Sequence, residues 1–258
     1  MSNYRDPYAG GYRPGGGYRI GAYPAVSSSS GIFVPPLGFT AILGYSASNI
    51  NGQSNVGFAD GLQFSTWTNL GSLGTAGDAT QATGGSRPTF IRNVGTQING
   101  RSAVRGAGGQ SVATASFTAQ VQPLTWFALV KSDLTGSAQV FFGSLTSQEV
   151  FIAVGSPGNV QFYAGSTVTS TLTMQANKYH SIMFAENGAS SSGSLDGTGT
   201  GAISTGAQGI SQLTLMADST PANWLKGDLC ELWCYAGAAP TQPQWDASIN
   251  AYYGITPS

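Results

Sequence analysis

The stretch from residue 225 to residue 254, LKGDLCELWCYAGAAPTQPQWDASINAYYG, limits the possible folds more than any other part of the chain. Its first half, between Gly227 and Gly237, is an apolar segment with large side chains at both odd and even positions. A strand with two apolar faces is stable only between two covering layers. We therefore expect this strand near the centre of a β-sandwich.

A short helix is expected to follow this strand and to cap the sandwich. Thr241 can act as the N-cap, and Gln244, three residues later, as its capping-box partner. Gly254 can end the helix in a left-handed conformation. Three apolar residues recur at helical spacing and should face the core: Trp245, Ile249 and Tyr252.

The rest of the chain after residue 36 consists of short apolar segments separated by turn residues such as Asn-Gly and Asp-Gly pairs. About a dozen candidate strands come before the C-terminal stretch: 39–43, 62–67, 102–105, 111–117, 124–131, 140–143, 150–154, 160–164, 168–174, 178–186, 194–195 and 210–216. This pattern predicts one all-β domain over residues 37–258, a two-sheet antiparallel sandwich.

Charge limits the choice of partners. Only 8% of the residues are charged and the formal net charge is -1. Nucleic acid and acidic membranes select a basic field, so neither is expected as a partner. The first 21 residues lack the apolar core of a signal peptide, and no segment approaches the length of a membrane span. We expect a protein that is made in the cytoplasm and is not secreted.

The two cysteines, Cys230 and Cys234, lie four residues apart in the late strand. This spacing places both on one face of a regular strand, with Cα atoms about 13 Å apart. A disulfide needs a Cα separation below about 7 Å. Both cysteines are therefore expected to be buried free thiols.

Residues 1–36 differ from the rest because Tyr and Arg recur on a Gly- and Pro-rich background without helical or strand periodicity. One interpretation is a disordered tail. The interpretation we favour is an extended docking arm, because Tyr and Arg carry much of the binding energy of protein interfaces. The expected contact residues are Tyr4, Arg5, Tyr8, Tyr12, Arg13, Tyr18, Arg19 and Tyr23.

Several segments, in this order, resemble concanavalin A-like, laminin G-like jelly-roll domains. They are FADGLQFSTWTNLGS (58–72), DATQATGGSRPTF (78–90), INGRSAV (98–104), LTWFALVKSD (124–133), SLDGT (194–198) and the stretch that ends in Tyr-Gly (225–255). The resemblance covers about residues 40–255 and implies a jelly-roll topology. It departs from the family where some relatives bind calcium or sugar: Asn69 and the Gly71–Gly77 run replace an Asp-x-Ser-Gly-Asn loop, and Arg105-Gly106-Ala107 replaces Phe-Asp-Gly. We expect no metal and no cofactor.

Candidate catalytic residues are few. Glycoside hydrolysis needs two carboxylates that flank one bond. Asp228 and Glu231 are three residues apart, so in a regular strand they point to opposite faces, and we interpret Glu231 as structural. His180 lies in an apolar strand, and the sequence places no acidic residue or serine beside it to complete a triad. The sequence therefore predicts a protein that is not an enzyme.

Exposed tryptophans can stack on sugar rings, so the five tryptophans are the candidates for a glycan-binding site. Trp126, Trp233 and Trp245 fall in apolar runs and should be core. Trp67 and Trp224 lie near loops and could stack on a glycan.

Two functions remain open. Jelly-roll domains of the resembled type are common in bacteriophage decoration and fibre proteins, which implies a virion structural protein held to capsid or tail proteins by its N-terminal arm, in a homo-oligomer. The alternative is a carbohydrate-binding adhesin that recognises a host glycan. An enzyme ranks third.

Overall fold

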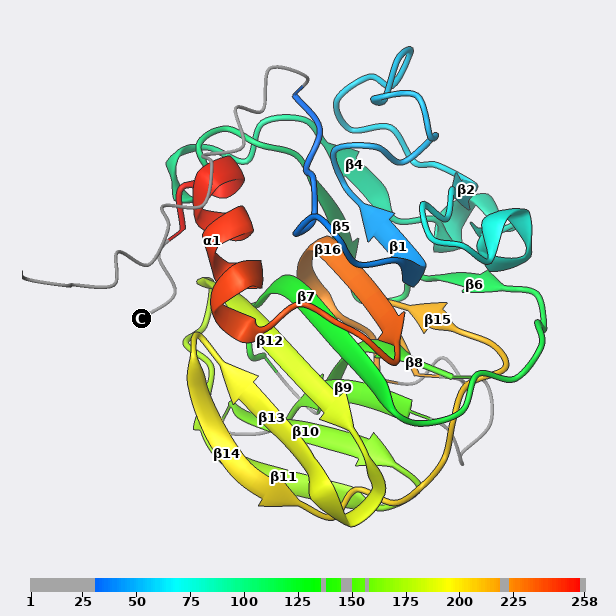
Figure 1. Cartoon of the computed structure of the whole chain (residues 1–258). Coiled ribbons are helices and arrows are strands. Elements are labelled where there is room, and N and C mark those ends of the chain that lie inside the picture. Colours follow the sequence, from blue (N-terminus) through cyan, green and yellow to red (C-terminus); the bar gives the residue numbers. More distant parts are fainter. Residues whose placement is uncertain (1–30, 136–137, 145–149, 156–157, 219–222, 256–258) are drawn as a thin grey trace, which may run out of the picture.

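The computed structural model describes residues 31–135, 138–144, 150–155, 158–218 and 223–255, without the side chains of residues 150 and 151. Within these residues the chain forms two antiparallel β-sheets that face each other, with one helix outside them (Figure 1). The predicted all-β sandwich with a short C-terminal helix is confirmed. The predicted contact residues of the arm, between Tyr4 and Tyr23, lie outside the described residues.

The first sheet has the strand order β14-β13-β12-β7-β16-β5-β4, and β1 also pairs with β16. Its strands are β1 (Ala41–Ser46), β4 (Thr89–Ile91), β5 (Ala103–Ala107), β7 (Leu124–Ser132), β12 (Tyr179–Glu186), β13 (Ser191–Leu195), β14 (Thr198–Ile203) and β16 (Lys226–Ala236).

The second sheet has the order β11-β10-β9-β8-β15-β6-β3-β2. Its strands are β2 (Thr66–Trp67), β3 (Ala79–Thr80), β6 (Val112–Thr114), β8 (Gln139–Gly143), β9 (Val150–Val154), β10 (Asn159–Ala164), β11 (Thr167–Thr173) and β15 (Thr214–Leu215). Short 3₁₀ helices interrupt the connections: η1 (Gly74–Gly77), η2 (Gly84–Ser86), η3 (Thr96–Ile98) and η4 (Gly188–Ser190).

The main core lies between the two sheets and is rich in aromatic side chains. Trp126 stacks on Phe142 with ring centroids 4.4 Å apart, and Phe162 packs against Phe184 at 5.0 Å. A second apolar cluster lies on the outer face of the first sheet, beneath α1 (Gln242–Tyr253). The first sheet is thus covered on both faces, as the apolar C-terminal strand predicts.

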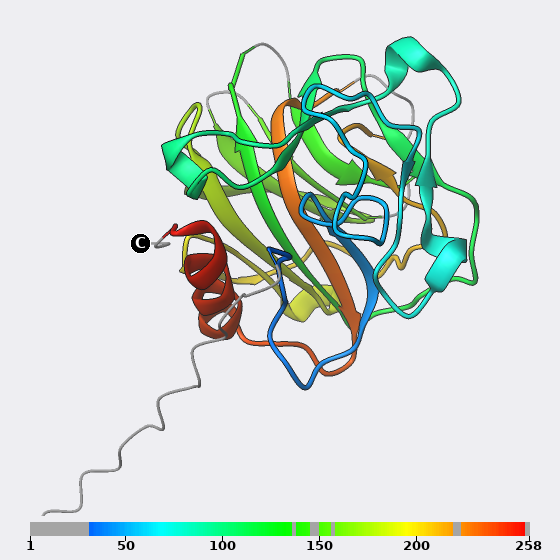
Figure 2. The same ribbon diagram turned by 90° about the horizontal axis from the view of Figure 1, so that it is seen from above.

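β16 occupies the middle of the first sheet (Figure 2). It pairs with β7 on one side, whereas on the other side its first residues pair with β5 and its last with β1. A β-bulge interrupts it: Leu229 pairs with Val130 and Glu231 with Leu129, so Cys230 is an extra residue.

The bulge corrects two expectations based on a regular strand. Cys230 and Cys234 are free and buried as predicted, but they do not share a face. Cys234 belongs to the core between the sheets, whereas Cys230 belongs to the cluster beneath α1. Asp228 and Glu231, which were expected on opposite faces, both have partners on the outer face. One inserted residue shifts the side-chain alternation and causes both differences.

α1 matches its prediction. The Oε1 atom of Gln244 accepts the backbone N–H of Thr241 at 2.8 Å, and Gly254 ends the helix with φ 68°. The three residues of the predicted stripe are buried: Trp245, Ile249 and Tyr252. No helix in the described ranges has the length and apolar character that a bilayer crossing needs.

The packed part of the chain begins before residue 37, inside the segment that the sequence assigned to the arm. Phe33 is buried in a cage of aromatic rings, with centroids 5.4 Å from Trp245 and 5.8 Å from Tyr252. Its N–H donates to Ser48 Oγ at 2.8 Å, and the Tyr252 hydroxyl donates to the carbonyl of Gly31 at 2.7 Å. The chain therefore enters the sandwich beside α1.

Candidate functional site

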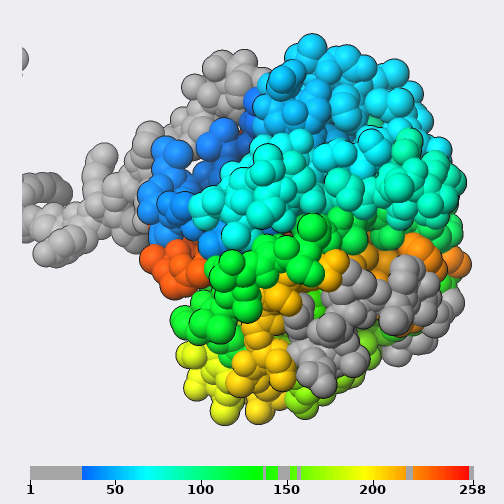
Figure 3. Space-filling view, turned by 90° about the vertical axis from the view of Figure 1, so that its right-hand side faces the viewer, coloured from blue at the N-terminus to red at the C-terminus, as the bar shows by residue number. Residues whose placement is uncertain are grey.

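An open groove of about 320 Å³ lies beside β2. In Figure 3 the blue and cyan segments that contain β2 cover the upper part of the face that is seen. We call this hollow the β2 groove; its lining residues are Asn51, Phe58, Leu62, Gln63, Phe64, Ser65, Thr66, Thr68 and Arg87. The lining combines apolar rings, neutral polar groups and one guanidinium.

The alternation of side chains along β2 builds the groove. Trp67 points into the core, where its ring lies 5.9 Å from that of Phe64, while its neighbours Thr66 and Thr68 line the groove. Phe64 is buried, and Phe58, at 6.2 Å from Phe64, is only half-buried. The groove therefore has an aromatic base that is partly open to solvent.

Several polar side chains of the groove have unused hydrogen-bonding capacity. Asn51 is occupied: its Oδ1 accepts the N–H groups of Gln53 and Asn55, and its Nδ2 donates to the Val56 carbonyl. Four others make no side-chain hydrogen bond to any part of the chain that the structure describes: Gln63, Ser65, Thr66 and Thr68. Their donors and acceptors are free for water or a ligand.

Arg87 is the charged member of the lining set and is held in one orientation. Its Nε donates to the carbonyl of Gln81 at 3.0 Å, and its Nη2 donates to the carbonyl of Ala82 at 2.9 Å. Both acceptors belong to the loop that leads into η2, so the side chain closes this loop. Arg87 as a whole residue is half-buried.

The tryptophans that the sequence selected for glycan stacking are not in the groove surface. Trp67 has 0% exposure and donates its indole N–H to the Ser46 carbonyl, so its proposed role as a stacking platform is wrong. Trp224 is half-buried and does not line the groove. Trp126, Trp233 and Trp245 are buried, which confirms their assignment to the core. Trp67 lies next to Thr66 and Thr68, which line the groove, but its own side chain faces inward.

The two β16 carboxylates have opposite electrostatic environments. Arg105 contacts Asp228 through two nitrogens at 2.7 and 3.0 Å, and Lys131 lies at 2.6 Å. Burial by itself would raise the pKa of Asp228, but hydrogen bonds from Arg105, Lys131 and Tyr179 outweigh it and hold the pKa below its ordinary value. Asp228 is therefore a buried structural anion.

Glu231 has neutral partners. Its carboxyl accepts hydrogen bonds from Tyr253, Trp233 and Ser46, which tie α1 and β1 to β16. Burial raises the pKa of Glu231 to about 8, although these hydrogen bonds oppose the shift. With 0% exposure, Glu231 cannot reach a substrate, which agrees with its assignment as structural.

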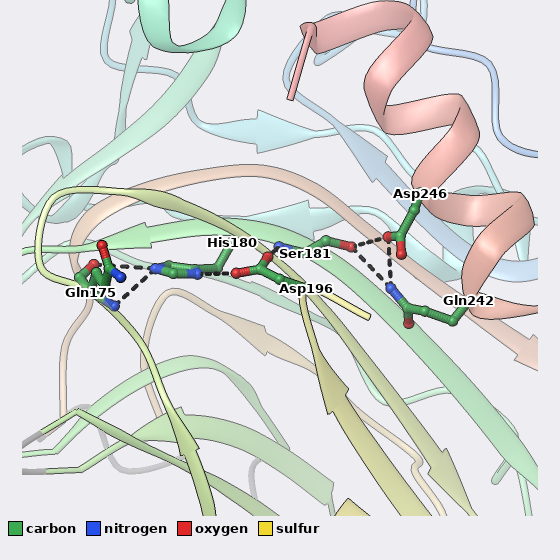
Figure 4. A network of polar contacts seen from close by, with 6 residues as sticks. All are labelled: Gln175, His180, Ser181, Asp196, Gln242 and Asp246. Atoms are coloured by element: carbon green, nitrogen blue, oxygen red, sulfur yellow. Dashed lines mark hydrogen bonds and ion pairs between the residues drawn. The ribbon is translucent and has the colours of Figure 1, made fainter. Parts of the chain in front are cut away.

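His180 belongs to a polar network that joins β12, the turn after β13 and α1 (Figure 4). Its Nδ1 lies 2.6 Å from Asp196 Oδ2, and its Nε2 accepts the N–H of Gln175 at 2.9 Å. The sequence placed no acidic residue beside His180; the turn between β13 and β14 brings Asp196 there. Ser181 Oγ donates to Asp246 rather than toward the imidazole, so the network is not a catalytic triad.

Metal ligands do not gather in the described residues. No three side chains of His, Cys, Asp or Glu in this part of the chain lie close enough together to hold a metal ion.

Comparison with known proteins found similar solved structures but no similar sequence family. No protein-family model matches the chain, and no curated protein matches it. Domain 4 of AbnA, a GH43 extracellular arabinanase from Geobacillus stearothermophilus in complex with arabinotriose, is similar over 81% of this chain and 98% of its own, with 16% identity and a TM-score of 0.53.

Two further solved structures resemble the chain at a TM-score of 0.54 over 83% of its length. They are an arabinofuranosidase complexed with arabinofuranosyl-alpha-1,2-xylobiose, at 11% identity, and a GH54 arabinofuranosidase soaked with a cyclic sulfate inhibitor, at 10% identity. This chain spans 60% of each of those proteins. At such identities the similarity establishes the β-sandwich fold.

Proposed function

We propose that this protein is a non-enzymatic glycan-binding module and that the β2 groove is its sugar site. A sugar presents an apolar face of C–H groups and a rim of hydroxyls, so its binding site needs an exposed ring beside unoccupied polar groups. The single observation that carries the proposal is that combination in one groove: the half-buried residue Phe58 beside Gln63, Thr66 and Thr68.

The comparisons favour a glycan over other ligands of the same size. The similar arabinanase domain was solved with arabinotriose, and the similar arabinofuranosidase with an arabinofuranosyl-xylobiose. The likeness gives no residue-level correspondence, so the groove is argued from this chain alone. The host-glycan adhesin considered above is one form of this proposal.

Binding without turnover is proposed because the groove lining contains no carboxylate. A glycosidase needs two of them within about 5 to 9.5 Å of each other at the scissile bond. The β16 pair, Asp228 and Glu231, is fully buried and engaged in other hydrogen bonds. Hydrolysis of a polysaccharide that stops on changing either residue, in a variant that stays folded, would contradict this part of the proposal.

A glycan array, followed by calorimetric titration of each hit, tests the site. Phe58→Ala removes the apolar surface and should weaken binding about tenfold or more. Val121→Ala is a matched apolar truncation at a side chain that is 74% exposed and outside the groove, and it should change nothing. Silence on a broad array, or loss of binding with Trp224→Ala but not with Phe58→Ala, would contradict the β2 groove as the sugar site.

The second candidate function is a structural role in a virus particle, with the arm bound to capsid or tail proteins and several copies associated. The specific observation that favours it is the Tyr- and Arg-rich sequence of residues 1–36. It is compatible with the first proposal, since a displayed sandwich can also bind a glycan. This candidate rests on the arm sequence, not on the groove.

Deletion of residues 1–30 tests the second candidate. Phe33 is part of the packed structure, so the deletion has to stop before residue 31 to leave the sandwich intact. The truncated protein should stay folded and lose its association with the particle, measured by co-sedimentation. Incorporation at the level of the full chain would rule the docking arm out.

A further inference from the structure

We infer that the glycan recognised by the β2 groove carries a carboxylate, as uronic and sialic acids do, and that Arg87 binds this group. The inference rests on the proposed function and specifies the class of its ligand. It starts from the way in which the guanidinium is held.

A guanidinium offers two edges to acceptors, one formed by Nε and Nη2 and one formed by Nη1 and Nη2. In Arg87 the carbonyls of Gln81 and Ala82 accept from Nε and Nη2, at 3.0 and 2.9 Å. These contacts use the N–H of Nε and one of the two N–H groups of Nη2. Nη1 has no hydrogen-bond partner within the described part of the chain, and Nη1 and Nη2 together have the spacing of a planar carboxylate, which can accept two parallel hydrogen bonds.

Arg87 also lacks a counter-ion of its own. In the described residues it forms no ion pair, and its fellow lining residues carry no charge. The acidic side chains on the neighbouring segments have other partners: Asp60 Oδ1 accepts the N–H of Arg92, and Asp78 Oδ1 accepts the N–H of Asn69. A fixed cation without a counter-ion, on a half-buried residue, favours an anionic ligand.

The rest of the groove fits the remainder of such a sugar. Phe58 provides the apolar contact, and Gln63, Thr66 and Thr68 have free donors and acceptors for ring hydroxyls. Because Arg87 is already fixed by its two carbonyl contacts, little conformational entropy is lost when a carboxylate binds. An acidic sugar therefore uses every chemical feature that the groove offers.

The experiment compares acidic oligosaccharides with their own reduced forms. Trigalacturonate and sialyllactose are titrated against the full-length protein, each beside the same oligosaccharide after reduction of the carboxyl groups to primary alcohols. At least one acidic form should bind about tenfold or more tightly than its reduced form, the size expected for a charge-assisted pair of hydrogen bonds. The difference should shrink as salt is added.

Variants then assign the effect to Arg87. Arg87→Gln should remove the preference for the acidic form, and Arg87→Lys, which keeps the charge but not the fork, should retain only part of it. Lys178→Gln removes a positive charge from an exposed site outside the groove and should leave the preference unchanged. If Arg87→Gln opens the loop at Gln81 and Ala82 and lowers the melting temperature, the variant is set aside. The comparison of acidic and reduced sugars on the unaltered protein then decides whether the groove prefers a carboxylate.

The possible failures are separable. Equal affinity for acidic and reduced forms, with binding abolished by Phe58→Ala, would overturn the carboxylate inference and leave the glycan-binding function standing. A clear preference for sulfated over carboxylated sugars would overturn it as well. No binding of any sugar would contradict both proposals.

Discussion

At the scale of single residues, β16 shows that burial does not fix the charge state of a carboxyl group. Asp228 and Glu231 are both fully buried, three residues apart and on one face of the same sheet. Asp228 lies against the cations of Arg105 and Lys131, whereas Glu231 has only neutral hydrogen-bond donors. The pKa of Asp228 is therefore lowered, and burial raises that of Glu231 to about 8.

Glu231→Gln should reduce the pH dependence of stability. The unfolded chain releases the Glu231 proton near the ordinary pKa of 4.5, whereas the folded protein keeps it until about 8. The contribution of Glu231 to the free energy of unfolding is thus greatest below pH 4.5, decreases as the pH rises to about 8 and is constant above that. As the pH rises from 5 to 8, the unfolding free energy of Glu231→Gln should therefore increase by a few kcal/mol relative to that of the unaltered protein. Urea titrations at both pH values measure it; parallel changes in both proteins would contradict the assignment.

Asp228→Asn should have the opposite pH signature. Because the pKa of Asp228 is lowered, its contribution is present above the ordinary value of 3.8 and is lost as the pH falls through the lowered one. At pH 7 we expect a loss of about 3 kcal/mol, at the low end for a broken buried ion pair because the Arg105 side chain is 42% exposed. The loss should be smaller near pH 3. Chemical denaturation at the two pH values is the measurement, and an equal loss at both would refute this account.

At the scale of elements, β2 and β16 show two ways in which a strand assigns its side chains to faces. At β2 simple alternation sends Trp67 inward and leaves Thr66, and Thr68 just after the strand, to the groove. In β16 one extra residue, Cys230, breaks the alternation and brings two acids to the same face. The same period of two therefore holds in one element and fails in the other.

Trp67→Ala and Trp224→Ala should differ sharply in their effect on stability. Trp67 is completely buried against Phe64 and Tyr45, so its removal leaves a cavity and should cost about 3 to 5 kcal/mol. Trp224 is half-buried and outside both apolar clusters, so its truncation should cost about 1 kcal/mol or less. Equilibrium unfolding in urea compares the two. A Trp67 variant as stable as the Trp224 variant would contradict the inward placement of Trp67.

At the scale of the whole molecule, the entry point of the chain and the groove lie on different sides. Gly31 is held by Tyr252 of α1, and Phe33 is seated beneath the same helix. In Figures 1 and 2, α1 and the cyan segment that contains β2 lie toward opposite sides of the sandwich.

Glycan affinity should therefore be independent of residues 1–30. The protein that lacks them should bind the sugar identified on the array with the same dissociation constant, within about twofold, as the full chain. Calorimetric titration of both proteins measures this. A large change in affinity on truncation would indicate that the N-terminal segment takes part in the site.

The sequence by itself determined the fold class, the central strand, the C-terminal helix with its cap and apolar stripe, and the free buried cysteines. These features depend on the local periodicity of apolar residues and on the rise per residue of a strand. Only the tertiary structure decided which face each β16 side chain occupies, since a bulge is an insertion relative to a partner strand and has no local signature. It also decided the groove, because nothing in the sequence links Arg87 to Thr66 and Thr68. They line one groove because the carbonyls of Gln81 and Ala82 fix the guanidinium beside a strand whose tryptophan points inward.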